Sequence, residues 1–505
     1  MSKYPPFLEK NIKLGLNKEL LKIMPRELIL EFDAFVFEKD SDSGLVKIAA
    51  VNPENIALRH YAKEKFGDKV EWFSAQKEDV DFILKNLKRD FKNDILFLAN
   101  NVTENNENIT KIVDGIIEYA LAQKASDIHI EPSRNEFLVR FRIDGAMHQM
   151  LNLPRSIYQA LVARIKIIAN LRIDEYRRPQ DGRIEPENFP DISLRTSIIP
   201  TLFGEKIAMR ILDDSQKDIL IEELGFSKEQ KNIILQNIEK PFGMIVASGP
   251  TGSGKTTTLY ALLQIFKKDG FNISTLEDPI EYVLHGVNQI QINLQVGLTF
   301  PIGLRSLLRQ DPDIMMVGEI RDTETASMAA DAAMTGHIVF TTLHTNDAAS
   351  AFTRFLEMGV DDFVVSSTIN LVIAQRLVRK ICNNCAEKKM LDKITIKKIK
   401  ERKDIMEALQ EKQIGSLNKF EEMTFRQGRG CDLCFQTGYL GRIGIFELLT
   451  PNKEIHDLIL SHKSSEAIRA AAEKNGFRDM ITDGIDKVFL GITTFEEVLR
   501  VTKNI

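Results

Sequence analysis

The feature that most constrains this chain is the glycine-rich stretch GPTGSGKT at residues 249–256. An apolar run, Gly243–Ser248, precedes it and predicts a buried parallel strand, and the run Thr256–Phe266 has the apolar spacing of a helix. A glycine-rich turn between a strand and a helix points backbone N–H groups, and the positive end of the helix dipole, at phosphate oxygens. The stretch therefore predicts a nucleotide-phosphate site in an α/β domain.

Each residue type in this stretch has an expected role. The glycines let the backbone turn inward, Lys255 is expected to reach the β- and γ-phosphates of ATP, and Thr256 is expected to hold Mg²⁺. The predicted nucleotide-binding residues are Gly249, Pro250, Thr251, Gly252, Ser253, Gly254, Lys255 and Thr256. A chance glycine-rich turn is disfavoured, because Lys-Thr stands in register between a predicted strand and a predicted helix.

An acidic block follows the next predicted strand, Ile273–Leu276. Glu277, Asp278 and Glu281 cluster where this strand ends, which is the position at which open α/β sheets bind ligands. A carboxylate there can orient a water molecule for attack on a γ-phosphate. The alternative interpretation is a polar turn before Pro279.

Two further predicted strands carry polar residues at their ends. Ile314–Val317 leads into Gly-Glu, which resembles a Walker B element, and Glu319 would act through Mg²⁺, either directly or through a bound water. Ile338–Leu343 is bracketed by His337 and His344, and His344 is the better candidate for sensing the γ-phosphate. A structural role in the core is the alternative for either histidine.

The four cysteines of the chain form two C-x-x-C pairs, Cys382 with Cys385 and Cys431 with Cys434. Four thiolates suit tetrahedral Zn²⁺ in a closed structural site. The spacer between the pairs is longer than in compact zinc ribbons, and the alternative is four unrelated thiols, some of them disulfide-bonded. Four cysteines are too few for a disulfide framework in a chain of 505 residues. Their pairing therefore indicates a metal site in a protein of a reducing compartment.

Composition narrows the class of protein. The length allows about three domains, and 43% apolar with 28% charged residues is ordinary for a soluble protein. We find no apolar run of the roughly 18 residues that span a membrane, and the start, MSKYPPFLEKNIK, lacks the apolar core of a signal peptide. A net charge of −5 gives no basic footprint for nucleic acid. We therefore expect a cytoplasmic protein without a nucleic-acid partner, which reaches a membrane only through other proteins.

Composition shifts and periodicity predict five domains and one linker. Residues 1–100 form a small α/β or α+β domain without a catalytic motif, Asn100–Asn108 is a linker, 109–215 is an α+β unit, 222–380 is the parallel α/β core, 381–445 holds the cysteines and 446–505 is helical. In the α+β unit the predicted strands are Asp127–Glu131, Phe137–Ile143, Ala146–Leu151, Ile192–Ile198 and Lys206–Leu212, with a helix over Pro154–Leu171.

Two arginines, Arg195 and Arg210, lie within apolar strand runs, where a charge needs a partner. A turn near Phe203-Gly204 would fold their strands into a hairpin and bring the two guanidinium groups near each other on one face. Buried side by side, they would require an anion such as the γ-phosphate of ATP. The alternative is that each pairs with a local carboxylate such as Asp191, Glu205 or Asp213.

These motifs, taken together, resemble those of the GspE/PilB-like secretion ATPases, which serve type II secretion and type IV pilus assembly. The resemblance rests on GPTGSGKTTTLY at 249–260, TLEDPIEY at 275–282, LRQDPDIMMVGEIRD at 308–322, TGHIVFTTLHT at 335–345, AQRLVRKIC at 374–382, the paired C-x-x-C motifs, SDIHIEP at 126–132 and RTSIIPTLFGEKIAMRIL at 195–212. It runs from about residue 110 to the C-terminus, and residues 1–100 resemble the N-terminal domain of the family more loosely.

The resemblance implies an α/β fold with a RecA-like P-loop ATPase core, preceded by a PAS-like α+β domain and a small N-terminal domain, with a four-cysteine zinc insertion and a helical C-terminal tail. It implies a hexameric ATPase that uses ATP, Mg²⁺ and Zn²⁺ and binds the cytoplasmic side of an inner-membrane platform protein. Glu281 would activate water, Glu319 would serve Mg²⁺, and Arg195 and Arg210 would reach the phosphates. The cysteine insertion, absent from retraction ATPases of the superfamily, favours assembly over retraction.

Other functions remain open at this point. DNA uptake uses the same motifs, so the sequence does not choose between it, type II secretion and pilus assembly. A nucleic-acid translocase on the same core is disfavoured by the acidic net charge. A regulatory module that hydrolyses little ATP is disfavoured by the presence of Glu281, Glu319 and both histidines.

Overall fold

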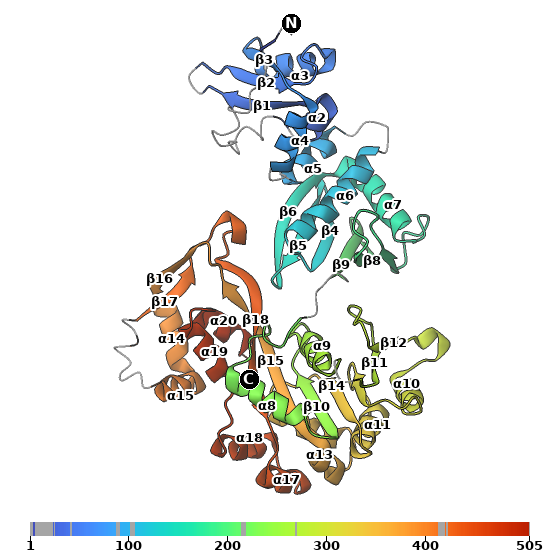
Figure 1. The fold of residues 1–505 in the computed structure, drawn as a ribbon, viewed down its shortest axis with the longest axis vertical. Coiled ribbons are helices and arrows are strands. Elements are labelled where there is room, and N and C mark those ends of the chain that lie inside the picture. The colour runs from blue at the N-terminus through green and yellow to red at the C-terminus, as the bar shows by residue number, and fades with distance from the viewer. Residues whose placement is uncertain are drawn as a thin grey trace. The chain divides into compact units, whose positions relative to one another are not determined.

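A computed structural model describes residues 4–5, 24, 26–40, 43–86, 91–101, 107–213, 219–267, 270–412, 420 and 423–503. The chain divides into two compact units, Met1–Asp213 and Asp214–Ile505 (Figure 1), and each is described by itself. Most of the predicted linker Asn100–Asn108 lies outside the described residues, which omit 102–106. In the described part, we find no helix long and apolar enough to cross a membrane.

The first unit begins with a three-stranded sheet in the order β1-β2-β3, in which β1 is antiparallel and β3 parallel to β2. Strand residues such as Phe35 and Ile48 belong to one buried hydrophobic core with Leu58 and Ile83 of the adjoining helices. The elements are α2 (Arg26–Phe32), β1 (Ala34–Lys39), β2 (Val46–Ala50), α3 (Ile56–Phe66), β3 (Val70–Ser74) and α4 (Lys77–Asn86). This small α/β sheet carries none of the chemistry-bearing motifs.

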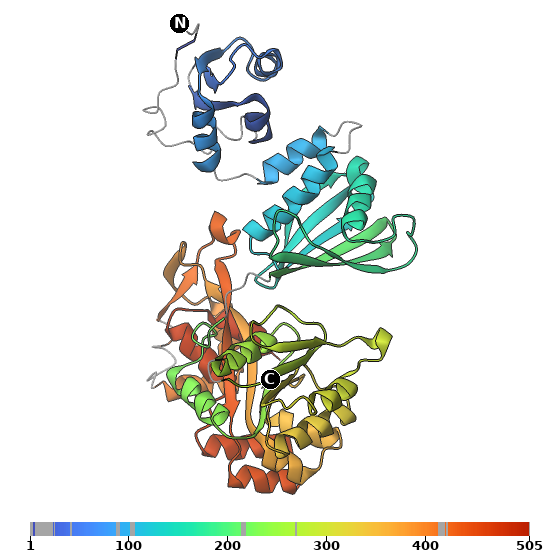
Figure 2. The same ribbon diagram turned by 45° about the vertical axis from the view of Figure 1, so that its right-hand side comes forward.

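A six-stranded antiparallel sheet follows, in the order β6-β5-β4-β9-β8-β7. Figure 2 shows helices packed along one of its faces. Strict alternation in β5 turns Phe137, Val139 and Phe141 toward that face and places Leu138 and charged residues on the other. The elements are α5 (Phe91–Asn100), α6 (Glu107–Ala122), β4 (Asp127–Pro132), β5 (Glu136–Ile143), β6 (Ala146–Pro154), η2 (Arg155–Ile157), α7 (Tyr158–Ile168), β7 (Gln180–Ile184), β8 (Ile192–Thr201) and β9 (Gly204–Asp213).

The five predicted strands of this unit are present, and two local predictions fail. The helix predicted over Pro154–Leu171 begins four residues later and ends at Ile168, because β6 continues through Pro154 and a single 3₁₀ turn intervenes. Strand β7 was not predicted, because its sequence QDGRI offers almost no apolar alternation and is held by pairing with β8.

The second unit is built on a seven-stranded sheet in the order β12-β11-β13-β14-β10-β15-β18, and the predicted α/β fold class is confirmed. Every neighbouring pair is parallel except β15 and β18. Met244 and Val246 of β10 face one hydrophobic core and Ile245 and Ala247 the other, so helices cover both faces. The strands are β10 (Gly243–Ser248), β11 (Ile273–Glu277), β12 (Asn288–Gln291), β13 (Ile314–Val317), β14 (Ile338–Leu343), β15 (Ile369–Ile381) and β18 (Tyr439–Leu449).

The helices of this unit fall on the two faces according to the cores they enter. One core receives α8 (Lys228–Ile238) and α9 (Lys255–Phe266). The other receives α10 (Phe300–Leu307), α11 (Thr323–Met334), α12 (Ala349–Glu357), α13 (Asp362–Thr368), α17 (Lys453–Leu460) and α18 (Ser465–Lys474). Two last helices, α19 (Met480–Phe489) and α20 (Phe495–Val501), pack with the cysteine-bearing segment.

The cysteine-bearing segment is an excursion between two neighbouring strands of the main sheet. It contains β16 (Ala386–Met390), α14 (Lys393–Glu401), α15 (Lys403–Glu411), β17 (Thr424–Gly428) and η4 (Asp432–Cys434), and β16 pairs with β17 in a separate ribbon. Strand β18 then returns to the sheet beside β15. The predicted boundary at residue 445 therefore falls inside β18, because the sequence did not show that this strand belongs to the main sheet.

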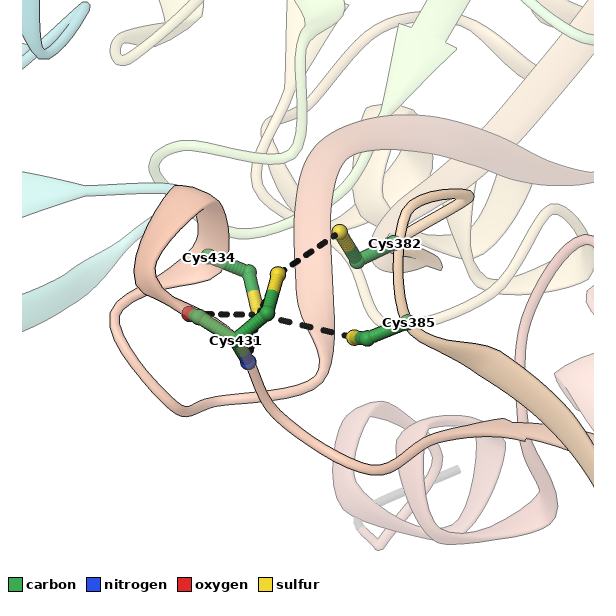
Figure 3. A group of neighbouring side chains, drawn as sticks. All are labelled: Cys382, Cys385, Cys431 and Cys434. Atoms are coloured by element: carbon green, nitrogen blue, oxygen red, sulfur yellow. Dashed lines mark hydrogen bonds between the residues drawn. The ribbon is translucent and has the colours of Figure 1, made fainter. Parts of the chain in front are cut away.

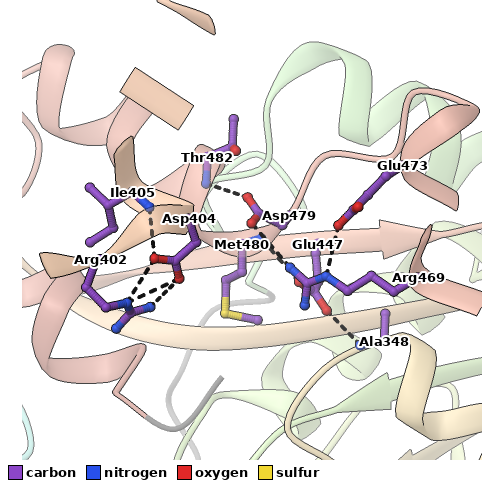
Figure 4. Close-up of polar contacts among 10 residues, drawn as sticks. All are labelled: Ala348, Arg402, Asp404, Ile405, Glu447, Arg469, Glu473, Asp479, Met480 and Thr482. Carbon is purple, nitrogen blue, oxygen red and sulfur yellow. Dashed lines mark hydrogen bonds and ion pairs between the residues drawn. The ribbon is translucent and has the colours of Figure 1, made fainter. Parts of the chain in front are cut away.

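Glu447, on β18, is a buried carboxylate that ties two distant segments to the sheet. Its Oε1 accepts a hydrogen bond from the Ala348 backbone N–H at 2.7 Å, and its Oε2 accepts one from the Met480 N–H at 3.2 Å. Figure 4 shows the carboxylate between these segments with Arg469 beside it. Burial raises the pKa of Glu447 to about 7, because these hydrogen bonds and Arg469 offset only part of the desolvation of the charge.

The raised pKa of Glu447 predicts a pH-dependent stability. The folded state binds this proton more tightly than the unfolded chain, so stability falls as the pH rises from about 4.5 through about 7. We expect Glu447→Gln to remove this dependence, worth about 3 kcal/mol across the window. Because the amide can turn a donor toward the Met480 N–H, the variant should be less stable than the unmodified chain near pH 4.5, and the difference should shrink as the pH rises. Urea unfolding of the full chain across this pH range measures both effects. Glu387→Gln, an exposed glutamate on β16, is the control, and equal pH slopes for Glu447→Gln and the unmodified chain would contradict the assignment.

Candidate active site

The phosphate loop Gly249–Thr256 joins the carboxyl end of β10 to the start of α9. Gly252 and Gly254 have φ of 77° and 90°, a left-handed conformation that glycine adopts at little cost. At Gly249 a Cβ would lie 2.6 Å from Ser253 Oγ and 2.7 Å from the Gln375 carbonyl oxygen, so the loop has no room for a side chain there. The loop has the backbone form expected of a phosphate cradle.

Lys255 is the buried cation of this loop. Its Nζ donates to the Gly249 carbonyl oxygen at 2.7 Å and to the Pro250 carbonyl oxygen at 3.2 Å. Burial lowers the pKa of Lys255 to about 8, although nearby Glu319 favours the charged form. The ammonium group therefore lies over the loop, where an anion would stabilise its charge.

Glu319 and His344 lie at the same edge of the sheet as the phosphate loop. Glu319 follows β13, and its side chain is 13% exposed. Its carboxylate forms an ion pair with Arg321 and lies 3.6 Å from His344 Nε2. Burial lowers the pKa of His344, and the charge of Lys255 lowers it further. The structure thus brings Lys255, Glu319 and His344 within electrostatic reach of one another.

His337 lies elsewhere in the same unit. It precedes β14, whereas His344 follows it, and β14 pairs in parallel with β10 from Ile338 opposite Gly243 to Leu343 opposite Ser248. The full length of the strand therefore separates His337 from the phosphate loop. Its Nδ1 lies 2.9 Å from the Ala332 carbonyl oxygen at the end of α11. Within one chain, the two predicted histidines do not form a common site.

The acidic block after β11 divides into one buried and one more accessible glutamate. Glu277 is 2% exposed, and its carboxylate accepts hydrogen bonds from Tyr260 Oη, from Thr275 Oγ1 at 2.6 Å and from Gln289 Nε2 at 3.2 Å. Burial raises the pKa of Glu277, and these three donors counter part of the rise. Glu281 lies four residues further on, in a half-buried loop outside the strand. Glu277 is therefore bound within the protein by buried side chains. Glu281 is the glutamate of the block whose place outside the strand leaves it accessible to a ligand.

Arg195 and Arg210 are direct cross-strand partners on β8 and β9. The premise that they are buried is wrong, because both side chains are exposed on the face of the sheet opposite its core. Arg210 Nε lies 3.3 Å from Asp127 Oδ1, and Arg142 Nε lies 3.3 Å from the other oxygen of the same carboxylate. Arg183, opposite Arg195 on β7, extends the row. The sheet presents a row of four arginines with one aspartate.

Two residues that position the phosphate loop and its neighbour were not assigned from the sequence. Gln375 Nε2 donates to the Ser253 carbonyl oxygen at 2.7 Å, and Arg376 donates to the Asn346 carbonyl oxygen at 2.9 Å. Both are buried on β15. They lie in the AQRLVRKIC stretch, where a polar pair inside an apolar strand was the available signal.

The four cysteines converge on one point between β15 and β18 (Figure 3), and their sulfur atoms all lie within 4.8 Å of one another. The separations are 3.9 Å for Cys382 and Cys431, 3.8 Å for Cys385 and Cys434, and 3.6 Å for Cys431 and Cys434. A tetrahedral Zn²⁺ with bonds of about 2.3 Å places its sulfurs about 3.8 Å apart, whereas a disulfide needs about 2 Å. The cysteines are free, and the four-sulfur set fits zinc.

Comparisons with known proteins place the chain among secretion proteins. Residues 102–500 match the family described as "Type II/IV secretion system protein". The chain is 42% identical over 398 residues to the type IV pilus assembly ATPase PilB of Pseudomonas aeruginosa, covering 78% of this chain and 68% of that protein. It is 44% identical over 393 residues to PilB of Thermus thermophilus, of which it covers only 43%. Type II secretion system protein E of P. aeruginosa is 41% identical over 403 residues, with 79% and 76% covered.

Solved structures agree with this at the level of the fold. The ATPase DotB of Legionella pneumophila aligns with a TM-score of 0.56 at 21% identity, over 78% of this chain and 96% of DotB. The pilus retraction motor PilT with bound ADP aligns with a TM-score of 0.52 at 24% identity, over 77% and 96%. The resemblance found in the motifs is confirmed, and the chain belongs to the type II/IV secretion system protein family.

Proposed function

We propose that this chain is an ATP-hydrolysing motor subunit whose output is mechanical. The observation that carries the proposal is the meeting of the phosphate loop, Glu319 and His344 at one edge of a parallel sheet. A buried cation and a helix N-terminus there can stabilise phosphate charge, and carboxylates can orient water. The names of the pilus assembly and secretion relatives support the same activity.

ATP would be held by the phosphate loop, with Lys255 toward the β- and γ-phosphates. Thr256 and Glu319 would hold Mg²⁺, since a hydroxyl and a carboxylate are the oxygen ligands this ion prefers. When bound, Mg²⁺ neutralises part of the phosphate charge. The left-handed turns at Gly252 and Gly254 and the hydrogen-bonded placement of Lys255 are the features of this chain that fit the nucleotide.

Glu281 is proposed as the residue that activates water. Within its block Glu277 already accepts three hydrogen bonds from buried side chains, which leaves it unsuited to exchange a proton with water. Glu319 is the second candidate, because the charge of its carboxylate acts on Lys255 of the phosphate loop. His344, beside Glu319, would sense the γ-phosphate. His337 would act only toward another subunit, because it precedes β14 and so lies at the end of the strands opposite to the phosphate loop.

Arg195 and Arg210 are proposed to reach the γ-phosphate when the PAS-like domain, residues 109–215, closes over the core. Two adjacent exposed cations repel each other, and a phosphate between them removes that repulsion. Asp127, on the neighbouring strand β4, forms an ion pair with Arg210 and holds its guanidinium group in line with the other arginines of the row. Hydrolysis would then depend on closure, and each closure would move one domain against another.

Zn²⁺ is proposed to be held by Cys382, Cys385, Cys431 and Cys434 in a closed structural site. Two backbone N–H groups, of Cys431 and Gly438, point to Cys434 Sγ at 3.3 Å, an arrangement that favours a thiolate. The metal would join the two ends of the excursion between β15 and β18.

The motor is proposed to act as a homohexamer at the cytoplasmic face of the inner membrane, on a platform protein of a pilus or type II secretion machine. The 1–100 segment is the proposed docking domain. Relatives named for both machines support this class without choosing between them, and DNA uptake belongs to the same class. The net charge of −5 counts against a nucleic-acid translocase, and stimulation of ATP hydrolysis by DNA would favour it.

The first test concerns Glu281. Glu281→Gln preserves shape and removes a base, so kcat should fall by on the order of 10²- to 10⁴-fold with little change in ATP binding. Steady-state hydrolysis and equilibrium binding of ATP measure the two effects. Lys255→Ala is the contrasting variant and should lose binding as well as turnover. If KM rises and kcat holds, Glu281 binds substrate and Glu319 becomes the better base.

The second test concerns the arginine row. Arg195→Ala or Arg210→Ala should lower kcat by on the order of 10³-fold, as removal of an arginine finger does, and leave ATP affinity of the open state near that of the unmodified chain. Arg134→Ala, an exposed arginine of the same domain, is the control. Loss of thermal stability with or without nucleotide, at an unchanged kcat per folded molecule, would leave the arginines a structural role with Asp127.

The third test concerns the metal. Purified protein should contain about one Zn²⁺ per chain by elemental analysis. Cys431→Ser should release it and destabilise the cysteine-bearing segment, whereas Leu433→Ala, an exposed residue between two of the ligands, should retain it. Metal-free protein of full stability would refute the assignment.

A further inference from the structure

The loop that carries Glu281 is held through its backbone by glutamine side chains of β12. Gln289 Oε1 accepts a hydrogen bond from the Leu284 N–H at 2.6 Å, and Gln289 Nε2 donates to the Tyr282 carbonyl oxygen at 3.1 Å. Gln291 Oε1 accepts one from the Ile280 N–H at 3.4 Å. A loop between strands that pair side by side is thus fixed on both sides of Glu281.

The sequence of β12 explains how one short strand does this. Residues two apart on a strand point to the same side, so Gln289 and Gln291 both project toward the loop. Strand β12 is the outermost strand of the sheet among the described residues and pairs in parallel with β11. The loop from the end of β11 to the start of β12 is short, so it stays close to these two strands.

Tyr260 links this loop to the helix that begins at the phosphate loop. It lies on α9, it is fully buried, and its hydroxyl donates to Glu277. The backbone of Glu281 lies close enough to this hydroxyl to act on the pKa of Tyr260, countering part of the rise that burial causes, and Gln289 Nε2 lies 3.3 Å from the hydroxyl. The ring of Tyr260 also packs edge-on against Tyr282, with centroids 4.7 Å apart. One phenol therefore contacts Glu277 before Glu281 and Tyr282 directly after it.

These contacts form one buried polar network of Tyr260, Glu277, Thr275 and Gln289. Both oxygens of the Glu277 carboxylate are occupied by donors from this network. A buried network whose members satisfy one another is rigid, because moving one member leaves another without a partner in a medium of low dielectric constant. The network has no exposed member that could itself meet substrate: Tyr260, Glu277 and Thr275 are buried and Gln289 is half-buried.

We propose that Tyr260, together with Gln289, is a positioning residue that holds Glu281 at a set place relative to the phosphate loop. The inference rests on the proposed role of Glu281 as the residue that activates water. Tyr260 lies five positions after Lys255 on one helix. The helix and the network therefore connect the loop that carries Glu281 to the phosphate loop. Neither Tyr260 nor Gln289 exchanges a proton with substrate.

A double-mutant cycle in the full chain tests the proposal. Tyr260→Phe keeps the ring and removes the hydroxyl, and we expect kcat for ATP to fall about tenfold with the affinity for ATP unchanged, since a small displacement of a reacting group carries a cost of this order. The same substitution in a Glu281→Gln background should cause no further loss, because the group that Tyr260 positions no longer acts. Single-turnover hydrolysis measures the slow variants.

The control is Tyr439→Phe, which removes a tyrosine hydroxyl bonded to Thr494 Oγ1 at 2.8 Å away from the phosphate loop and should leave kcat unchanged. Gln289→Met is the second variant, in case Tyr260→Phe disturbs α9. It should lower kcat in the same way and lose the effect in the Glu281→Gln background.

Two results would overturn the inference while the proposed function stands. One is a kcat for Tyr260→Phe within about twofold of the unmodified chain, and the other is an equal fold-loss in both backgrounds, which would mean that Tyr260 acts independently of Glu281. If Glu281→Gln alone retains kcat, the role of Glu281 fails, and the inference fails with it. The cycle therefore separates failure of the positioning residue from failure of the base.

Discussion

The parallel register of β10 with its two neighbours is the constraint on which the site depends. Ser248, the last residue of β10, is level with Leu343 on β14 at one side and with Ala374 on β15 at the other. Parallel strands end at the same edge, so the phosphate loop begins beside His344 and Gln375. Residues from three distant parts of the sequence meet there because the sheet places their strands side by side.

Buried polar side chains that bind backbone groups then hold the loops at this edge. Gln375 binds the phosphate loop, Gln289 binds the segment around Glu281, and Glu447 binds the start of α12. Gln375 and Glu447 each satisfy a backbone group that would otherwise be buried without a partner, which costs about 1–3 kcal/mol per group. Such contacts fix the loops through the protein's own side chains, and electrostatic stabilisation of a reaction needs groups that are placed in advance in this way.

The exposure of Arg195 and Arg210 changes how their proposed role is understood. Buried cations would have required an anion for the fold itself, whereas exposed cations are solvated by water and leave the domain stable without one. Their mutual repulsion is weak in water and grows when a surface covers them. The proposed closure would therefore occur only with a phosphate present, which is the property a nucleotide-driven motor needs.

The sequence by itself determined the local structure and the candidate chemistry. Gly243–Ser248 and Ile338–Leu343 were predicted at the bounds observed for β10 and β14, and the phosphate loop was predicted between its strand and its helix, because apolar periodicity and glycine spacing are local signals. The two C-x-x-C pairs likewise predicted a four-cysteine cluster, and the structure brings the four sulfur atoms together.

Only the tertiary structure decided which of these residues meet. Strand order separates His337 from His344, adds β18 to the main sheet and turns Arg195 and Arg210 to the open face, and none of this is encoded in a run of neighbouring residues. The roles of Tyr260 and Gln289 were invisible for the same reason: a tyrosine on a helix and a glutamine on an edge strand acquire a function only through partners far away in the chain. Pairing between distant segments, stabilised by burial of the whole sheet, determines them.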